Sequence, residues 1–257
     1  MHTLEPSGGI LHVYQTGDRP VTLLCSDSNH YICKFKHPGE AANKLVSEMI
    51  GSTFARIWRI STPYISLITN DPVIWLDSGI SHDLTAPLLG SRKMENVCDL
   101  SNMNADAVVQ TRRSLDQLLW IALFDMWIVN EDRTYNNYNL LYDLKKEEIV
   151  SIDYGGIFNS GIMNGPVYQL NDSDSIIMSS LFDRLKGLGL AESMMRMVRS
   201  FKFRVEQCRR SVPGLLHSIP ESWEVDIART SRKLDELLRE EWVQETWQNF
   251  TDIANRY

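Results

Sequence analysis

Residues 125–139, DMWIVNEDRTYNNYN, end one of the most apolar segments of the chain with a cluster of polar side chains. The stretch holds three acids and four asparagines. A helix in a soluble protein usually ends with one or two capping residues and a glycine. A second polar stretch, VSIDYGGIFNSG at 150–161, follows a few residues later. So many oxygen-bearing side chains at one helix end indicate a candidate ligand site.

Length, composition and charge limit the class of protein. The chain has 257 residues, of which 43% are hydrophobic and 23% are charged. These values suit a globular module with a sizeable core. The formal net charge of -7 argues against direct nucleic-acid binding as the main role.

The sequence favours a cytoplasmic protein. Its four cysteines have no CxxC spacing, so reduced thiols are expected rather than zinc sites or disulfides. The N-terminus lacks the basic start and apolar run of a signal peptide. The most apolar stretch, 118–124, is far too short to span a bilayer, so no membrane insertion is expected.

The N-terminal part has the pattern of a small sheet. Short runs rich in β-branched and aromatic residues are separated by turn clusters, which predicts three antiparallel strands and then two more. Apolar residues at three- and four-residue spacing predict one helix between the two groups. The strands are expected at 10–15, 21–26, 30–36, 62–69 and 72–78, and the helix at 40–58.

The C-terminal part has a helical pattern. A strong helix is expected from residue 111 to about 130, and the chain after about 173 is nearly all helical in pattern. Between them, 138–143 and 147–153 predict a hairpin. A strand within 88–97 is expected to lead into a linker.

These patterns predict an α+β, two-lobed fold in one module, 1–257. The N-lobe, 1–100, would hold a small antiparallel sheet and one helix, and the C-lobe, 101–257, would be mainly helical. A cleft between two such lobes is a natural place for a ligand.

Three side chains of the polar stretches suit phosphoryl transfer. The predicted hairpin can bring Asp132, Asn137 and Asp153 together. Mg²⁺ prefers oxygen ligands, usually one or two carboxylates completed by substrate phosphates, and Asn137 and Asp153 offer that set. Asp132 remains to orient, or take a proton from, an attacking hydroxyl. The order Asp, Asn five residues on, and then Asp-x-Gly is typical of the lower half of a kinase-like site.

The predicted N-lobe supplies matching groups for a triphosphate. Lys34 lies in a strand, where it can pair with the α- and β-phosphates. Glu48, 14 residues on in the predicted helix, can hold Lys34 in place. Ser7, Gly8 and Gly9 form a glycine turn whose N–H groups can cover phosphates.

Together these motifs resemble the HipA-like kinases of bacteria, especially their short single-module branch. The resemblance rests on YICKFK at 31–36, NEDRTYNNYNLL at 130–141, VSIDYGGIF at 150–158 and IPESW at 219–223. It covers roughly residues 7–225. A more distant resemblance links the Asp-Arg order and the following Asn to phosphatidylinositol 3-/4-kinases.

The resemblance implies an ATP- and Mg²⁺-dependent protein Ser/Thr kinase with a protein-kinase-like fold. Asp132 would match the catalytic aspartate, Asn137 and Asp153 the Mg²⁺ ligands, and Lys34 the nucleotide lysine. Residues 7–9 would match the phosphate loop, whose serine is autophosphorylated in some members. Several members are toxins restrained by a small DNA-binding antitoxin, which is a candidate partner here besides an unidentified protein substrate.

The sequence also departs from the family. PSGGILHV, at 6–13, lacks the fuller Ser-x-Gly-Gly-x-Gln-Pro pattern, and Glu131 stands where small residues or proline are common. Glu131 adds negative charge beside a triphosphate site. These departures leave open a pseudokinase or regulatory nucleotide-binding module. A kinase for a lipid or small-molecule hydroxyl ranks below the protein kinase, because no basic amphipathic patch stands out.

Structural alternatives remain for the single residues. Asp132 could only end a helix and Asn137 only form a turn. Lys34 could be a solvated strand lysine and Glu48 a surface acid. Asp125 interrupts an apolar run, so we expect it to be buried and to need a partner, such as Arg133 or the backbone of the following loop.

Overall fold

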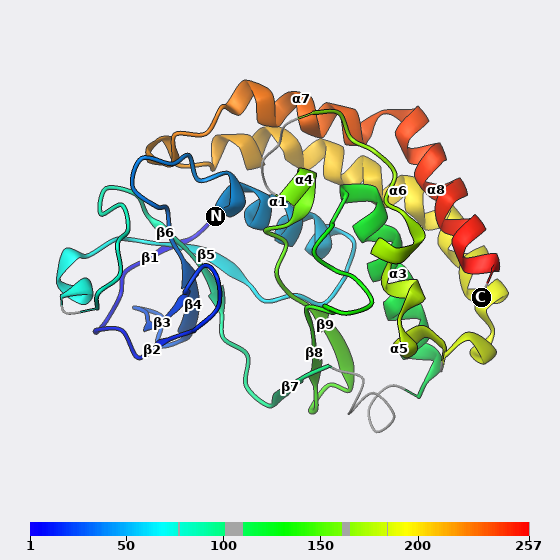
Figure 1. The fold of residues 1–257 in the computed structure, drawn as a ribbon, viewed down its shortest axis with the longest axis horizontal. Helices are drawn as coiled ribbons and strands as arrows, with labels where there is room; N and C mark the ends of the chain where they lie inside the picture. Colours follow the sequence, from blue (N-terminus) through cyan, green and yellow to red (C-terminus); the bar gives the residue numbers. More distant parts are fainter. Residues whose placement is uncertain (77, 101–109, 161–164, 184, 257) are drawn as a thin grey trace.

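The N-terminal strands form one six-stranded sheet in the computed structural model, which describes residues 1–76, 78–100, 110–160, 165–183 and 185–256. The sheet lies at one end of the molecule, and α3, α5 and α8 lie toward the other (Figure 1). Its strand order is β1-β5-β6-β4-β3-β2. The strands are β1 (Thr3–Leu4), β2 (His12–Val13), β3 (Val21–Leu24), β4 (His30–Lys34), β5 (Ile65–Ile68) and β6 (Leu88–Arg92).

The pairing within this sheet confirms the predicted antiparallel group β2-β3-β4. All neighbours are antiparallel except the parallel edge pair β1 and β5. In β4, Tyr31 and Cys33 are buried on one face, and Lys34 points to the other. The alternation follows from the two-residue period of a strand.

The strand predicted at 72–78 is wrong. Pro72–Trp75 forms a short 3-10 helix, η1. The Asp71 carboxylate accepts a hydrogen bond from the Val73 N–H at 2.9 Å, and proline stands at the first helical position. Both are helix-start signals, and they outweigh the apolar run that follows.

Helix α1 (Asn43–Ile57) lies between the sheet and the helical part (Figure 1). It packs against α4 (Ile157–Ser160) and α6 (Leu190–His217), and its apolar residues belong to the same core as those helices. A separate, smaller core lies within the sheet, between β3, β4 and η1. Thus α1 is anchored mainly in the helical part, although it precedes β5 and β6 in the chain.

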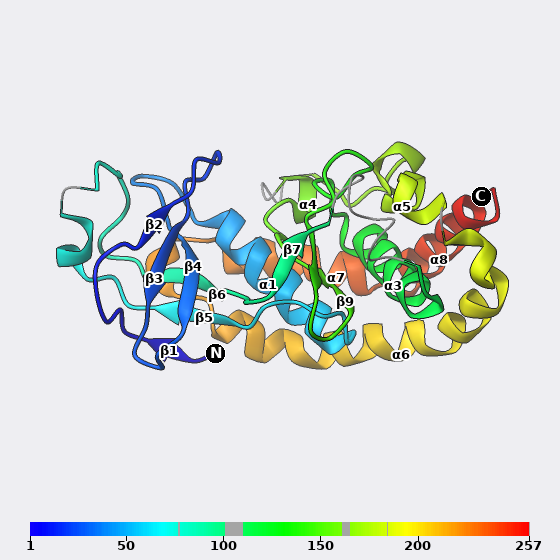
Figure 2. The same ribbon diagram turned by 90° about the horizontal axis from the view of Figure 1, so that it is seen from below.

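The helical part is built around α3 (Arg112–Ile128), α6, α7 (Ile227–Leu238) and α8 (Glu240–Asn255). Two indole N–H groups tie these helices together. Trp127 donates to the Leu237 carbonyl and Trp242 to the Trp127 carbonyl, both at 2.9 Å. Figure 2 shows α6 running along the length of this part. The shorter helices are α5 (Ser180–Asp183), η2 (Asp172–Asp174), η3 (Ile176–Met178), η4 (Lys186–Leu188) and η5 (Glu221–Trp223).

The predicted hairpin is confirmed as β8 (Leu140–Asp143) and β9 (Glu148–Ser151). A third strand, β7 (Val97–Asp99), pairs with β8. The hairpin follows directly on the polar stretch at the end of α3. It therefore carries the chain from Asp132 back to Asp153.

Residues from η5 bind the helical part to the sheet. The Trp223 indole donates to the Pro87 carbonyl, and the Trp223 carbonyl accepts from the Ala42 N–H, both at 2.9 Å. Lys36 forms an ion pair with Glu224 at 2.8 Å. The chain thus has a sheet-rich N-terminal part and a helical C-terminal part, which confirms the α+β class. The lobe boundary near residue 100 stays a prediction.

The four cysteines are free thiols, as expected. No helix within the described part of the chain is both long enough and apolar enough to cross a membrane.

Candidate active site

The polar stretch begins where α3 ends in a left-handed residue. Val129 has φ 55°, which is unfavourable for a β-branched side chain. The conformation is held because the Val129 and Asn130 N–H groups both bond to the Asp125 carbonyl. The reversed chain then leaves Asn130 buried and carries Asp132 to the cleft. Backbone strain of this kind concentrates at functional sites.

Asp125 and Arg133 form a buried ion pair, which we call the buried clasp. Their side chains are 3% and 0% exposed, and Asp125 Oδ2 lies 2.8 Å from Arg133 Nε. Asn130 Nδ2 donates to Asp125 Oδ1 at 2.8 Å. This confirms the expected burial of Asp125 and its pairing with Arg133.

The clasp also fixes the backbone around the site. Arg133 Nη1 donates to the carbonyls of Tyr138 and Asn139 at 2.8 and 2.5 Å, and Nη2 donates to the Ile152 carbonyl at 3.2 Å. One guanidinium thus ties the loop after α3 to the end of β9. The residue next to Ile152 is Asp153, so the clasp sets the relative position of both parts of the site.

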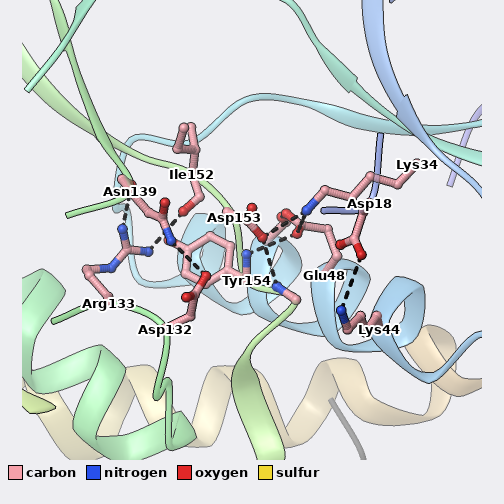
Figure 3. A network of polar contacts seen from close by, with 12 residues as sticks. Asp18, Lys34, Lys44, Glu48, Asp132, Arg133, Asn139, Ile152, Asp153 and Tyr154 are labelled. Carbon is pink, nitrogen blue, oxygen red and sulfur yellow. Dashed lines mark hydrogen bonds and ion pairs between the residues drawn. The ribbon is translucent and has the colours of Figure 1, made fainter. Parts of the chain in front are cut away.

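Asp132 is exposed and held by the amides of Asn137 and Asn139, of which Figure 3 shows that of Asn139. Asn137 Nδ2 donates to Asp132 Oδ1 at 3.0 Å and to the Asp132 carbonyl at 2.9 Å. Asn139 Nδ2 donates to Asp132 Oδ2 at 2.9 Å. Spacing in the sequence does not predict this contact of Asn139 with Asp132, and the backbone of the loop is braced by Arg133. The sequence feature that could have revealed this contact is the position of Asn139, seven residues after Asp132 and at the start of the hairpin.

The second polar stretch packs tightly against the loop that carries Asp132. A Cβ on Gly156 would lie 2.6 Å from Asp132 Cβ, so only glycine fits there. Asp153 has φ 59°, and its Oδ1 accepts from the Gly155 N–H at 3.3 Å. The structure therefore brings Asp132, Asn137 and Asp153 to one place, as the spacing predicts.

Lys34, Glu48 and Asp153 form a second charged group, which we call the cleft triad (Figure 3). Lys34 Nζ lies 2.9 Å from Glu48 Oε2 and 2.8 Å from Asp153 Oδ1. Glu48 Oε2 also accepts from the Tyr154 N–H at 3.0 Å. An ammonium has three N–H donors, and the two carboxylates use two of them. The predicted Lys34–Glu48 ion pair is present.

The charges of the triad shift one another's protonation. Burial disfavours the Lys34 ammonium, but Glu48 and Asp153 outweigh it and raise the pKa of Lys34. Burial raises the pKa of Glu48, opposed by Lys34. For Asp153 the attraction of Lys34 outweighs burial, and the pKa is lowered. Lys34 and Asp153 are therefore held in their charged forms.

Two cavities meet beside the triad. One, of about 230 Å³, is lined by Asp18, Lys44, Glu131, Asp132, Asp153, Gly155 and Gly156. The other, of about 220 Å³, is lined by Lys34 and the start of α1, and shares Asp18, Lys44 and Gly155 with the first. Asp132, Asp153 and Lys34 thus face one continuous cleft. Glu131 lies in it as well, as the sequence implied.

The structure does not bring Ser7, Gly8 and Gly9 to Lys34. The Ser7 N–H bonds to the Leu24 carbonyl, at the end of the β3–β4 hairpin remote from Lys34. Among the described residues, nothing beyond the chain neighbours lies within 4 Å of a Cβ built on Gly8 or Gly9, and both glycines are exposed.

The turn at 16–20, TGDRP, occupies the place expected for the phosphate loop instead. It joins β2 to β3 at the end of the hairpin that carries Lys34. Its Asp18 lines both cavities and forms an ion pair with Lys44 at 3.2 Å (Figure 3). The sequence feature that could have identified this turn is its position: it directly precedes the two strands that end in Lys34.

The donor set at Asp132, Asn137 and Asp153 fits Mg²⁺. The Asn137 amide nitrogen is used by Asp132, which leaves its oxygen as a ligand. The Asp153 side chain is 40% exposed and faces the cleft. Among the described residues, no three His, Cys, Asp or Glu side chains gather as a metal site. An ion held here would thus take phosphate oxygens and water as its other ligands, as Mg²⁺ commonly does.

Comparison with known families agrees with this geometry. The HipA-like kinase family matches residues 10–251. The chain belongs to the HipA-like kinase family. Membership makes it a phosphotransferase that uses ATP, and it confirms the resemblance seen in the sequence. No curated protein matches the chain.

Three solved kinase structures are similar to this HipA-like kinase to different extents. The proinflammatory kinase CtkA of Helicobacter pylori is 13% identical, with a TM-score of 0.50 over 100% of this chain and 95% of CtkA. The Golgi casein kinase is 11% identical, with a TM-score of 0.44 over 95% of this chain and 74% of its own. The open conformation of CtTel1 is 12% identical, with a TM-score of 0.38 over 91% of this chain and 11% of its own. The likeness to CtkA shows a protein-kinase-like fold, as predicted.

Proposed function

We propose that this HipA-like kinase transfers the γ-phosphoryl group of ATP to a serine or threonine hydroxyl of a protein. The observation that carries the proposal is the assembled cleft triad, in which Lys34 Nζ contacts Glu48 and Asp153 at 2.9 and 2.8 Å. The triad borders the cleft that Asp132 also lines.

Each side chain has a role that follows from its contacts. Lys34 directs its remaining N–H donor to the nucleotide phosphates, because Glu48 and Asp153 already hold its other two. The turn at 16–20 covers the phosphates from the sheet side. Asn137 and Asp153 would hold Mg²⁺, which when bound neutralises charge on the phosphate oxygens.

Asp132 acts on the acceptor. The two amides fix the orientation of its carboxylate and use one lone pair of each oxygen. A carboxylate accepts about four hydrogen bonds, so each oxygen can still accept one from a hydroxyl. The hydroxyl oxygen forms a bond to the γ-phosphorus, its proton passes to Asp132, and ADP leaves with the electrons of the broken P–O bond.

The complete triad favours turnover over a pseudokinase. Glu131 motivates that alternative, since it places a further carboxylate in the cleft. Yet Lys34, Asp132 and Asp153 line one cleft, and the buried Glu48 carboxylate contacts Lys34 behind it. A module that only bound nucleotide would not need Asp132 oriented by two amides.

The test is transfer from labelled ATP with Mg²⁺ to host lysate proteins, followed by phosphoamino-acid analysis. The wild type is expected to label serine or threonine. Asp132→Ala should lower transfer about 10²- to 10⁴-fold, as for loss of a general base, while ATP still raises the melting temperature. Asp235→Ala, which changes an exposed acid on α7, is the matched control and should keep full activity.

Two results would contradict the proposal. Nucleotide binding with no transfer to protein, to itself or to water would indicate a regulatory module. Transfer only to lipid or to a small alcohol would remove the protein acceptor. A role as the toxin of a toxin–antitoxin pair rests on the family resemblance alone. Growth arrest on expression that Asp132→Ala relieves, and that a flanking DNA-binding protein also relieves, is the outcome that role predicts.

A further inference from the structure

Four arginines line a cavity of about 370 Å³ away from the cleft. They are Arg59, Arg112, Arg113 and Arg204. Arg59 follows the end of α1, Arg112 and Arg113 begin α3, and Arg204 comes from α6. The cavity thus lies where three helices meet. We call it the arginine pocket.

The arginine pocket is remote from the proposed catalytic groups. It lies beside the first half of α3, whereas Asp132 follows the end of that helix. From Ile121, the last residue of α3 that lines the pocket, the helix runs about 10 Å further to its end at Ile128. Among the described lining residues, the arginine pocket shares none with the two cavities of the cleft, so a ligand in it would not occupy the cleft.

Nearby carboxylates neutralise only some of the four arginines of the arginine pocket. Arg113 pairs with Glu148 at 3.2 Å, and Arg112 pairs with Glu192 at 2.5 Å. Asp116, the one acid among the described residues that line the pocket, is already bound by Arg196 Nη2 at 2.9 and 3.0 Å. Among the described contacts, these pairs leave Arg59 and Arg204 without a carboxylate.

Arg204 is the more constrained of the two. It is half-buried, donates to the Trp58 carbonyl and lies 3.5 Å from the centre of the Trp120 ring. Burial and the nearby charge of Arg59 lower its pKa to about 10, so it remains charged at neutral pH. A half-buried cation next to a second cation is unfavourable unless an anion joins them.

We propose that the arginine pocket binds a phosphate monoester group. Guanidinium groups form paired, charge-assisted hydrogen bonds with phosphate oxygens. A phosphate monoester carries close to two negative charges at neutral pH, which matches the two arginines that lack an acid. The volume lies within the usual range for small-ligand sites, about 300–1,000 Å³, and the formal net charge of -7 makes a local group of cations notable.

The first experiment measures binding of inorganic phosphate and O-phospho-L-serine by calorimetry at low salt. Arg59→Gln should weaken binding at least about tenfold, because one charge-assisted contact is lost. Arg59 is exposed, and among the described contacts its side chain makes no hydrogen bond or ion pair, so the substitution leaves only its backbone bond to the Arg56 carbonyl, which glutamine keeps. Arg232→Gln on α7 removes the same charge from another exposed site and should leave binding unchanged. Lys34→Met should also leave it unchanged, because Lys34 lines the cleft and not this pocket.

Three results would overturn the proposal: no binding of either probe by the wild type, equal weakening by Arg59→Gln and Arg232→Gln, or loss in Lys34→Met with retention in Arg59→Gln. The last would place the phosphate in the cleft. A second arm compares a phosphoserine peptide with its unphosphorylated twin. Tighter binding of the phosphopeptide than of O-phospho-L-serine would assign the phosphate to a protein. Equal binding would assign it to a small phosphate ester.

Discussion

The cleft triad and the buried clasp are two charged groups built from similar parts. The clasp is sealed and neutral, and Arg133 uses its remaining donors on three carbonyls. The triad combines one lysine with two acids, and the Lys34 and Asp153 side chains are 21% and 40% exposed. A charged group that satisfies itself is structural, whereas one that keeps excess charge and an open donor at a cavity is prepared for a ligand.

The largest expected effect separates the two groups by function. Asp153→Asn should lower phosphoryl transfer about 10³-fold or more, because a charge that stabilises the transition state is lost. Its unfolding free energy should change by less than about 1 kcal/mol, since the side chain is partly exposed. Steady-state kinetics and urea unfolding measure the two quantities. Asp235→Asn is the control, and a large stability loss in Asp153→Asn would make the triad structural after all.

The next effect is on stability. Arg133→Met leaves the Asp125 carboxylate buried without its partner and should cost about 3–5 kcal/mol of unfolding free energy. Urea unfolding measures the loss. Arg133→Met with Asp125→Leu should recover part of it, because the unpaired charge is then removed as well. If Arg133→Met unfolds like the wild type, the clasp does not hold the loop.

The two groups should also respond to pH with opposite signs. Burial raises the pKa of Asp125 to about 6, despite Arg133. Its contribution to stability is therefore complete below about pH 4 and is lost as the pH rises through about 6, by about 3 kcal/mol at most. The pKa of Asp153 is lowered in the folded protein. Its contribution to stability is therefore present at a pH above its pKa in the unfolded chain, and is lost as the pH falls below that value.

Unfolding free energies from pH 3.5 to 7 test this difference. The advantage of the wild type over Asp125→Asn should shrink as the pH rises, and its advantage over Asp153→Asn should grow. Parallel curves for the two variants would show that the carboxyls do not differ in this way.

The smallest effect concerns the amide that orients Asp132. Asn139→Gly removes the hydrogen bond to Asp132 Oδ2 and tolerates the local φ of 44°. We expect kcat to fall about tenfold, as for loss of one hydrogen bond to a charged group, with KM for ATP unchanged. Asn136→Gly, in the same loop, is the control. Equal kcat values for the two variants would show that Asn139 does not orient Asp132 for catalysis.

The sequence predicted the parts of this molecule that depend on local pattern. The strand alternation, the helix stripes and the β8–β9 hairpin were all readable. So was the Lys34–Glu48 pair, because it joins a strand lysine to an acid in the helix that follows, 14 residues on. The run at 72–78 misled because short apolar runs do not distinguish a strand from a buried helical turn.

The features that the sequence did not predict are contacts between residues that lie far apart in the chain. Residues 7–9 have the composition of a phosphate loop, but strand direction places the turn at 16–20 beside Lys34 instead. Arg133 bonds to the Ile152 carbonyl across the hairpin, and the arginine pocket draws on three helices. Such long-range contacts depend on tertiary packing, so neither residue spacing nor composition reveals them.

Gly51 lies on α1, one turn after Glu48, where the helix presses on the segment that carries Asp153. A Cβ there would lie 2.3 Å from Tyr154 Cβ, and the Tyr154 N–H is what holds Glu48. A single added methyl group would therefore push α1 away and separate Glu48 from Lys34. In a scan of every position for growth or activity, residue 51 would score like a catalytic residue although it touches neither nucleotide nor acceptor. Gly51→Ala would thus inactivate the protein through one added methyl group, without changing any side chain that lines the cleft.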